Sequence, residues 1–504
     1  MRSEAAMKST NMILEGLLRQ VKPVDFYAIA NTKGDKEFKI KNRDVIVIAI
    51  DEILRLAENK LCLNNGKTYV YNGFYWSEVE ENMLKSFLGE AAARQGIDKL
   101  ASKHFNYREH LLKQFESAAY LPEPEEDPDK VLINLQNGTL EISASEQTIK
   151  LREFKSSDFL KYQLSFNYKP LLKAPIFESY LQHVLPDAES RKALLEYLGY
   201  LFIKHSSKRL KLEKVLILLG TGENGKSVLF EVMESLLGKE NVSNYSLANL
   251  TDNTGNTRAQ IADKILNYAT EINGSIGSDH FKAMASGEPI TARLLYKDTV
   301  NLTQYAKLIF NCNELPKEVE NTHGFFRRFM IIPFEVTVPK EEQDNQLSNK
   351  IIASELSGVL NLIIQNLQDL LQRGQFTKCD AIEKAREEYQ LESDSVRMFL
   401  HETMYQPSKR CTQLLKSLYT NYADYCKDSG NKPLAKPRFS KRLQSLGYSK
   451  GQDRNGVFFF VEEKTSKDFI QASPSSPLSQ TVADREESEE REAILQRFEF
   501  SEEL

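Results

Sequence analysis

The sequence is poor in cysteine, and its few cysteines form no metal-binding or disulfide pattern. Five are scattered over 504 residues: Cys62, Cys312, Cys379, Cys411 and Cys426. No two of them form a C-x-x-C pair, the usual spacing of zinc ligands, and their wide intervals give no disulfide framework. We therefore expect reduced, mostly buried thiols and no zinc site.

Long apolar runs are absent as well. No uninterrupted apolar stretch reaches the roughly 18 to 20 residues of a membrane span, and residues 1–19 lack the apolar core of a signal peptide. Hydrophobic residues make up 41% of the chain and charged residues 27%, values typical of soluble globular proteins. The length suggests two to four domains. We expect a cytoplasmic protein with no membrane partner.

The chain has little net charge, −5 overall, but the charge is unevenly distributed. Residues 408–454 hold eleven Lys or Arg against three Asp, a net charge of +8. Residues 471–504 hold nine acidic and three basic residues, a net charge of −6. A basic block followed by an acidic tail is typical of a nucleic-acid-binding module with a self-masking tail. A solvated surface would explain the basic block equally well.

The stretch GTGENGKS, residues 220–227, lies between the apolar runs 215–219 and 228–233. It satisfies G-x-x-x-x-G-K-[ST] between a predicted buried strand and a predicted amphipathic helix. Such a loop wraps phosphates with backbone N–H groups at a helix N-terminus.

This P-loop predicts ATP and Mg²⁺ as cofactors. Lys226 is expected to reach the β- and γ-phosphates, and Ser227 is expected to coordinate Mg²⁺. The predicted nucleotide-binding residues are Gly220, Thr221, Gly222, Glu223, Asn224, Gly225, Lys226, Ser227 and Val228.

The next apolar strand is expected within DKILNYATEI, residues 263–272, and it ends at Glu271. An acid at this strand end can orient the attacking water and contribute to binding of the metal ion. Many P-loop ATPases place two adjacent acids here, but this chain offers only Glu271, so the second acidic role stays unassigned. A surface glutamate at the end of a strand is the alternative.

A further strand, AKLIFNCNELP at residues 306–316, ends in Asn313. We predict that Asn313 holds the lytic water and senses the γ-phosphate; Asn311, two residues earlier on the same face, is the weaker candidate. The following stretch, GFFRRFMIIPFE, carries Arg327 and Arg328 just before another apolar strand. An arginine there can reach the nucleotide of a neighbouring subunit, or it can simply cap a surface carboxylate.

Residues 281–310 indicate what the nucleotide energy is used for. They predict a short helix, a turn at residues 286–289 and two strands that flank residues 296–298. A hairpin tipped with Tyr296 and Lys297, with Arg293 close by, is suited to gripping a nucleic-acid backbone by charge and stacking.

The ordered set GTGENGKS, NYATEI, KAMASGEPITARLLYKD, LIFNCNELP and FFRRFMIIPF resembles the superfamily 3 helicases. Within them it is similar to the phage and plasmid primase-helicase group that includes the poxvirus-type NTPase. Upstream, INLQNGTLEI and LLEYLGYLFIKH look like that group's helicase-associated domain. Downstream, SDSVRMFLHE, LKSLYTNYADYC, KPRFSKRLQSLGY and NGVFFFV look like its winged-helix module. The resemblance covers roughly residues 45–462.

The resemblance implies an α/β protein with an AAA+ P-loop ATPase core, an α+β N-terminal helicase-associated domain and a C-terminal winged-helix domain. The implied activity is that of a ring-forming, hexameric helicase that moves 3′ to 5′ on DNA in the replication of a phage, plasmid or mobile element. In matching positions, Lys226 and Ser227 bind phosphates and Mg²⁺, Glu271 holds the water and Asn313 is the sensor. Lys297, with Arg293 or Tyr296, tracks DNA, and Arg327 or Arg328 is the arginine finger.

The expected domain boundaries follow from these motifs. We expect an N-terminal helicase-associated domain ending in a helical collar, an ATPase domain, a linker helix, a winged-helix domain and a disordered acidic tail. Their ranges are 1–205, 206–375, 376–395, 396–464 and 465–504.

The basic block has helical spacing of its own. The predicted core positions of its two helices are Leu414, Leu415, Leu418, Tyr422 and Tyr425, then Phe439, Leu443 and Leu446. Between them, the side chains predicted to face phosphates are Lys436, Arg438, Lys441 and Arg442. Residues 453–461 supply a turn and strand suited to a wing. The expected partners are therefore duplex as well as single-stranded DNA, and further copies of this chain.

The first 130 or so residues show no D-x-D metal motif on a strand. The stretch YVYNGFYWSEV, residues 69–79, predicts a hairpin that buries the single tryptophan rather than a catalytic site. We therefore expect a helicase without primer synthesis, with a separate primase or replication protein as partner.

Two classes of function stay open. One is a replicative helicase; the other is an ATP-switched DNA-binding initiator, or a defence or regulatory NTPase, that does not unwind processively. The Lys297 hairpin favours the motor, because a switch needs no tracking element.

Overall fold

The computed structural model describes residues 4–32, 34, 38–58, 60–125, 127–205, 207, 210–270, 272, 278–293, 299–316, 320 and 322–463. The chain forms two compact units, Met1–Ser393 and Asp394–Leu504. Each unit is considered by itself.

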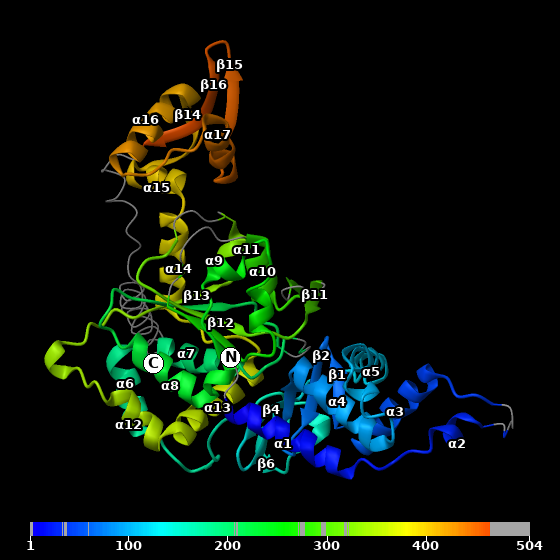
Figure 1. The fold of residues 1–504 in the computed structure, drawn as a ribbon. Helices are drawn as coiled ribbons and strands as arrows, with labels where there is room; N and C mark the ends of the chain where they lie inside the picture. The colour runs from blue at the N-terminus through cyan, green and yellow to red at the C-terminus, as the bar shows by residue number, and fades with distance from the viewer. Residues whose placement is uncertain are drawn as a thin grey trace, which may run out of the picture. The chain divides into compact units, whose positions relative to one another are not determined.

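A five-stranded parallel sheet forms the centre of the first unit (Figure 1). Its strand order is β13-β7-β12-β9-β8, with the bounds β7 Val215–Leu219, β8 Val242–Ser243, β9 Leu266–Ala269, β12 Lys307–Cys312 and β13 Phe329–Pro333. Strands covered on both faces read as continuous apolar runs. The strands predicted before the P-loop, before Glu271, before Asn313 and after the arginine pair are confirmed as β7, β9, β12 and β13.

Helices cover both faces of this sheet, because alternate side chains of each strand point to opposite sides. Leu216 and Leu218 of β7 pack into one apolar cluster with α7, α8 and α13. Val215 and Ile217 pack into a second cluster, on the face that α9, α10, α11 and α14 cover. The helices are α7 Ala188–Tyr200, α8 Lys226–Leu237, α9 Leu247–Leu250, α10 Ser278–Ser286, α11 His323–Phe326, α13 Leu356–Arg373 and α14 Asp380–Glu392. The P-loop domain is thus a three-layer α/β sandwich.

The segment between β9 and β12 contains the predicted helix and hairpin. Helix α10 is followed by β10 (Ile290–Arg293) and β11 (Thr299–Leu302), which pair antiparallel with Arg293 opposite Thr299. The predicted helix, turn and two strands are therefore confirmed. The tip residues Tyr296 and Lys297, like Glu271, lie outside the described residues.

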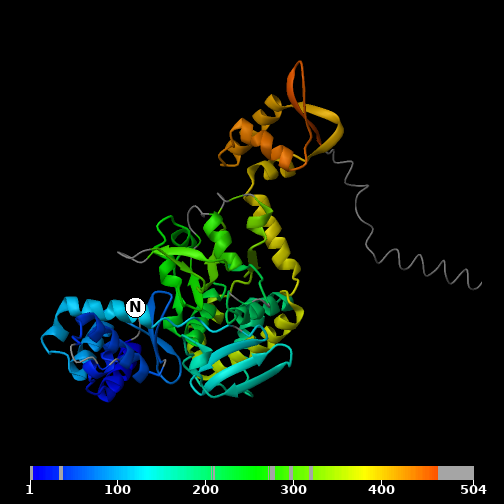
Figure 2. The same cartoon turned by 90° about the vertical axis from the view of Figure 1, so that its right-hand side faces the viewer.

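The part of the first unit before the P-loop is α+β. One three-stranded sheet comprises β1 Leu61–Asn64, β2 Lys67–Tyr71 and β3 Trp76–Val79, and a second comprises β4 Lys130–Leu135, β5 Gly138–Ser143 and β6 Thr148–Arg152. Figure 2 shows the second sheet in cyan. The helices are α1 Glu4–Gln20, α2 Phe26–Ala30, α3 Asn42–Leu56, α4 Glu81–Gln95, α5 Phe105–Ala118 and α6 Pro175–Val184; α12 Leu347–Ser354 follows the sheet of the P-loop domain. The predicted hairpin is β2–β3, and Trp76 is buried in it against Phe159.

In its described residues, 394–463, the second unit combines three helices with a small antiparallel sheet of order β14-β16-β15. Its elements run α15 Ser395–Glu402, β14 Tyr405–Leu414, α16 Leu415–Asp428, α17 Lys436–Ser445, β15 Lys450–Asp453 and β16 Gly456–Glu463. Leu418, Tyr422, Phe439 and Leu443 are buried as predicted. The prediction for Leu414 is wrong: it ends β14 and is 41% exposed, because α16 begins only at the next residue.

Buried thiols were expected, and four of the five cysteines are buried; Cys411 is exposed. In the part of the chain that the structure describes, no three His, Cys, Asp or Glu side chains are grouped as metal ligands. Among the same residues, no single helix has the length and hydropathy to cross a membrane. One pair of helices, 340–354 and 356–373, bent by 79°, passes on length and composition alone.

Candidate nucleotide site

The P-loop connects the end of β7 to the start of α8, and its backbone requires glycine at two positions. Gly222 and Gly225 have φ angles of +108° and +81°, in the left-handed region that side chains disfavour. A Cβ on Gly225 would also lie 2.7 Å from Cγ1 of Val184 on α6. The first N–H groups of a helix have no intrahelical acceptor, so the start of α8 is suited to donate hydrogen bonds to a phosphate.

Lys226, in the first turn of α8, is held inside the loop. Its Nζ donates to the carbonyl of Gly220 at 2.7 Å and to Oδ1 of Asn224 at 2.8 Å. Asn224 in turn donates from Nδ2 to the carbonyl of Phe334 at 3.1 Å. Burial lowers the pKa of Lys226 from its ordinary value. A phosphate would supply the opposite charge that this buried ammonium lacks.

Two elements outside the motif support the loop. Tyr180 on α6 donates its hydroxyl to the carbonyl of Gly225 at 2.8 Å. The N–H of Val338 donates to the carbonyl of Glu223 at 2.8 Å. Neither residue was predicted from the sequence to have a role, because neither lies near a recognisable motif.

The loop opens into a cleft of about 1000 Å³. One wall is the P-loop with Ser227, and another contains Thr270 at the end of β9 together with Asn311 and Asn313 of β12 and its exit. The remaining walls come from α6 and residues 338–348. The cleft therefore lies beyond the carboxyl ends of the parallel strands, where α/β sheets bind ligands.

The two asparagines differ in their surroundings. Asn311 is buried, and its Oδ1 accepts a hydrogen bond from the Tyr268 hydroxyl at 2.9 Å. Asn313 is exposed just past β12. Asn313 is thus the more accessible of the two to a bound phosphate or water.

The arginine pair lies at the amino-terminal ends of the strands, whereas the P-loop lies at their carboxyl ends. Arg327 and Arg328 directly precede β13, and β13 runs parallel to β7 with Phe329 opposite Val215. The P-loop instead begins at Gly220, five residues beyond Val215, which is roughly 16 Å at about 3.3 Å per residue. Neither arginine is therefore placed beside the P-loop of its own chain.

The arginines make different contacts. Arg327 is half-exposed and pairs with Oε2 of Glu213 at 2.5 Å, while its carbonyl accepts from Nζ of Lys214 at 2.5 Å. Arg328 is largely buried, donates to Oγ of Ser286 at 2.9 Å and also donates to the Gly324 carbonyl. Of these two arginines, Arg327 is the one whose guanidinium is accessible to another molecule.

In the hairpin, Arg293 is exposed at the last described pair before the tip. Its backbone N–H donates to the carbonyl of Gly255 at 3.1 Å. The guanidinium of Arg258 holds the same strand, because its Nε donates to the carbonyl of Thr291 at 2.8 Å.

In the second unit, the four predicted phosphate-facing side chains lie on α17. Arg438 and Lys441 are exposed, and Lys436 is half-buried. Arg442 was also predicted to be free to face phosphates, and that prediction is wrong. Its guanidinium binds the buried Asp394 at 2.6 and 2.8 Å, because Asp394 caps α15 and lies against α17.

Three protein-family models match successive parts of the chain. They are described as D5 N terminal like (residues 51–186), family of unknown function DUF5906 (residues 218–328) and poxvirus D5 protein-like (residues 391–474). The second match contains the P-loop, the hairpin and the arginine pair.

Among curated proteins, the chain is similar to two viral relatives. It is 24% identical over 323 residues to the putative helicase L207/L206 of Acanthamoeba polyphaga mimivirus, covering 61% of this chain and 33% of the relative. It is 24% identical over 320 residues to the putative helicase 121R of Invertebrate iridescent virus 3, covering 55% and 33%. The chain thus matches about a third of the length of each relative.

Among solved structures, the C-terminal region of NrS-1 aligns with a TM-score of 0.45 and 12% identity, over 82% of this chain and 99% of that chain. This similarity is too weak to carry an argument. The D5 matches on both sides of the P-loop domain, with the viral helicase relatives, agree with the ordered motifs. Together these matches support a D5-like superfamily 3 helicase family for the chain.

Proposed function

We propose that the protein is an ATP-dependent DNA helicase. The observation that supports this most directly is the occurrence, in one domain, of a glycine-bent P-loop with an inward-held Lys226 and a β10–β11 hairpin. The hairpin is inserted between β9, which precedes Glu271 in the sequence, and β12, which precedes Asn313, so a nucleotide-dependent shift of those strands would move it. A switch protein would not need this insertion.

In this proposal, Lys226 binds the β- and γ-phosphates, Glu271 orients the attacking water and Asn313 senses the γ-phosphate. Mg²⁺ would arrive with ATP. Ser227 is exposed in the cleft at the start of α8, and a single hydroxyl suits Mg²⁺, which keeps several waters and phosphate oxygens as ligands. The bound Mg²⁺ would neutralise charge that develops on the phosphates.

We propose that Arg327 is the arginine finger and that it acts on a neighbouring subunit. This is supported by its exposure and by its position at the sheet edge away from its own P-loop. The proposed assembly is a closed homo-oligomeric ring, expected to be a hexamer.

The second unit is proposed to be a winged-helix module that binds duplex DNA. The order helix, strand, helix, helix, strand, strand, with the β15–β16 hairpin in the position of a wing, supports this assignment. Exposed Arg438 and Lys441 would contact phosphates. We further propose that the helicase moves 3′ to 5′ on DNA and acts in the replication of a phage, plasmid or mobile element. A separate primase is its proposed partner.

ATP hydrolysis with and without single-stranded DNA, measured beside unwinding of a forked duplex, tests the function. Lys226→Ala should lower hydrolysis by about 10²-fold or more. Lys297→Ala should keep basal hydrolysis and lose unwinding, and Lys384→Ala, a surface lysine on α14, is the matched control. Slow hydrolysis that ignores DNA, with no duplex opened by the wild type, would instead favour an ATP switch.

A further inference from the structure

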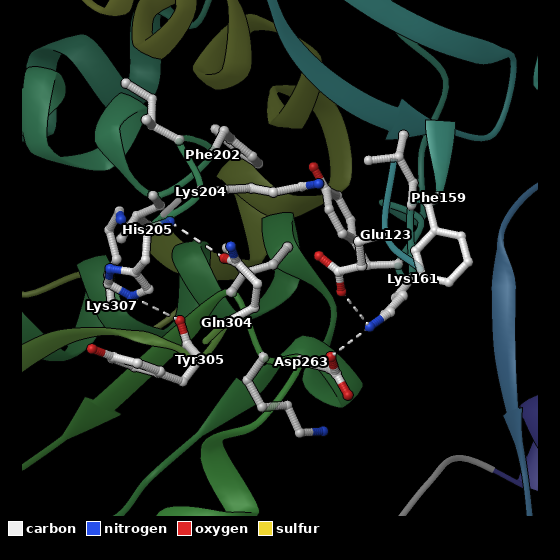
Figure 3. Close-up of a pocket in the computed structure, with 16 residues that line it drawn as sticks. Glu123, Phe159, Lys161, Phe202, Lys204, His205, Asp263, Gln304, Tyr305 and Lys307 are labelled. Carbon is white, nitrogen blue, oxygen red and sulfur yellow. Dashed lines mark hydrogen bonds and ion pairs between the residues drawn. The ribbon is translucent and has the colours of Figure 1, made fainter. Parts of the chain in front are cut away.

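A small pocket of about 100 Å³ lies at the edge of the sheet where β9 and β12 begin (Figure 3). It is lined by Glu123 and residues 159–162 from the N-terminal part, by residues 201–205 that follow α7, and by residues 263–265 and 304–307 beside the sheet. Figure 3 shows His205, Gln304 and Tyr305 together on one side of it. Five segments that are distant in sequence thus meet at this pocket, near the base of the hairpin.

His205 makes a specific set of contacts with the segment that leads into β12. Its ring stacks on Tyr305 with a centroid distance of 4.3 Å and an interplanar angle of 29°. Nε2 of His205 lies 3.0 Å from the Tyr305 carbonyl, which can only accept, so this nitrogen carries the hydrogen. The backbone N–H of His205 donates to Oε1 of Gln304 at 3.3 Å.

Tyr305 extends these contacts to the base of the hairpin. Its hydroxyl donates to the carbonyl of Glu288 at 2.8 Å, in the turn that leads into β10. Gly287 in the same turn has φ +67°, and a Cβ there would lie 2.7 Å from Nδ1 of His205. Glycine is required at this position both by the backbone conformation and by the close approach of the histidine.

The other end of this arrangement lies at the cleft beside the P-loop. Tyr305 is followed at once by Ala306 and β12, and β12 runs across the sheet to Asn313 in the cleft. The backbone N–H of Ala306 donates to the carbonyl of Ile261 at 3.0 Å, which holds the start of the strand. A strand is stiff along its length, so a displacement at Asn313 is transmitted to Tyr305.

The surroundings of His205 favour its neutral imidazole form. Burial, and then the neighbouring Lys307, lower the pKa of His205 well below its ordinary value. Lys307 itself lies 4.1 Å from the centroid of the Tyr200 ring, at the end of α7. The neutral imidazole can stack on Tyr305 and donate from Nε2.

We infer that His205 is a positioning residue that couples the DNA-gripping hairpin to nucleotide hydrolysis. It holds the Tyr305 segment, and through it the turn before β10, against the end of α7. Movement of β12 then shifts the base of the hairpin, because the contacts of Tyr305 connect the two. The inference rests on the proposed helicase function. His205 touches neither ATP nor DNA, so its effect is on the link between the two.

The test is ATP hydrolysis of the full chain over a range of single-stranded DNA concentrations. For His205→Ala we expect basal turnover and KM for ATP to stay within about twofold, while stimulation by DNA falls roughly 3- to 10-fold. His205→Phe keeps the stacked ring and should recover at least half of the stimulation. His110→Ala, at an exposed histidine on α5, is the matched control.

Tyr305→Phe keeps the stack and the core but removes the hydroxyl that binds the Glu288 carbonyl. It should fold even if His205→Ala does not, and it should lower DNA stimulation about twofold or more. Combining His205→Ala with Lys297→Ala should add little to Lys297→Ala alone, since both act on one route.

Three results separate the possible outcomes. If the wild type is not stimulated by DNA, the proposed function fails. If the wild type is stimulated and folded His205→Ala and Tyr305→Phe are stimulated equally, the inference is overturned. It is also overturned if basal and stimulated turnover fall by the same factor, because His205 would then have a purely structural role.

Discussion

At the scale of single residues, adjacent side chains in one motif have different environments. The sequence could not separate Arg327 from Arg328, since both have the same type and flank the same strand. The structure gives Arg327 an exposed guanidinium paired with Glu213, whereas Arg328 is largely buried and donates to Ser286 and Gly324. The two arginines should therefore respond differently to substitution.

Arg327→Ala should lower ATP turnover of the assembled protein by about 10³-fold and change the free energy of unfolding by less than about 1 kcal/mol, since exposed ion pairs contribute little. Arg328→Ala should lower the free energy of unfolding by about 1 to 3 kcal/mol, because it leaves buried polar groups without a partner. Steady-state hydrolysis and urea unfolding of both variants check this. The assignment of the finger is wrong if Arg327→Ala hydrolyses ATP normally.

At the scale of elements, charged side chains join the N-terminal part to the sheet. Asp263, just before β9, accepts from Nζ of Lys161 at 3.1 Å, from Nζ of Lys67 at 3.2 Å and from the Tyr69 hydroxyl at 2.6 Å. Figure 3 shows Lys161 between Asp263 and Glu123. Burial alone would raise the pKa of Asp263, but Lys161 and Lys67 outweigh it and lower the pKa far below its ordinary value.

Asp263→Ala should lower the free energy of unfolding by about 3 to 5 kcal/mol, because it strips a partner from the buried Lys161. A carboxylate with a depressed pKa stabilises the fold above its unfolded pKa and loses that contribution as pH falls toward its folded pKa. The difference between the wild type and Asp263→Ala should therefore be full near pH 7 and shrink below about pH 4. Urea unfolding from pH 7 to pH 3 measures it, and Asp51→Ala, at an exposed acid on α3, is the control. A difference that does not change over this range would contradict the assignment.

Helix α17 is a second case at this scale. Arg438→Ala with Lys441→Ala should weaken duplex binding, and each lost phosphate contact should reduce the slope of log K against log salt by about 1. Basal ATP hydrolysis should be unchanged. Arg442→Ala should instead destabilise the second unit, because it leaves Asp394 buried without its partner. Fluorescence anisotropy at several salt concentrations tests this, and equal loss of hydrolysis and binding would refute the proposed division of roles.

At the scale of the whole molecule, the proposed active site is complete only between two subunits. Lys226 lies at the carboxyl edge of the sheet and Arg327 at the amino edge, so a competent site would combine Lys226 of one copy with Arg327 of another. Variants at the two positions can therefore complement each other.

Lys226→Ala and Arg327→Ala proteins, each inactive alone, should regain hydrolysis when mixed in equal amounts. Random assembly makes about a quarter of the sites complete, each taking one good residue from each variant. Turnover of the mixture beside that of each variant at the same total concentration is the measurement. If the mixture stays as inactive as its components, the finger does not act between subunits.

Much of the fold was predictable from local pattern. The buried strands β7, β9, β12 and β13 read as short apolar runs, and the P-loop motif implies its strand and helix because only a glycine-rich turn brings backbone N–H groups to a phosphate. The hairpin after α10 was found in the same way. Leu414 was misjudged because helical spacing alone does not mark where β14 ends and α16 begins.

The sequence by itself determined the candidate chemistry of the chain, namely a P-loop motif with Lys226 and Ser227, polar residues at the strand ends, and a basic second unit, because these depend on residue type and short spacing. Only the tertiary structure decided which of these groups are available. It buried Arg328, paired Arg442 with Asp394 and brought His205 to Tyr305 and Lys161 to Asp263. Such contacts join residues about 40 to 100 positions apart, and their formation depends on packing between elements that no local pattern encodes.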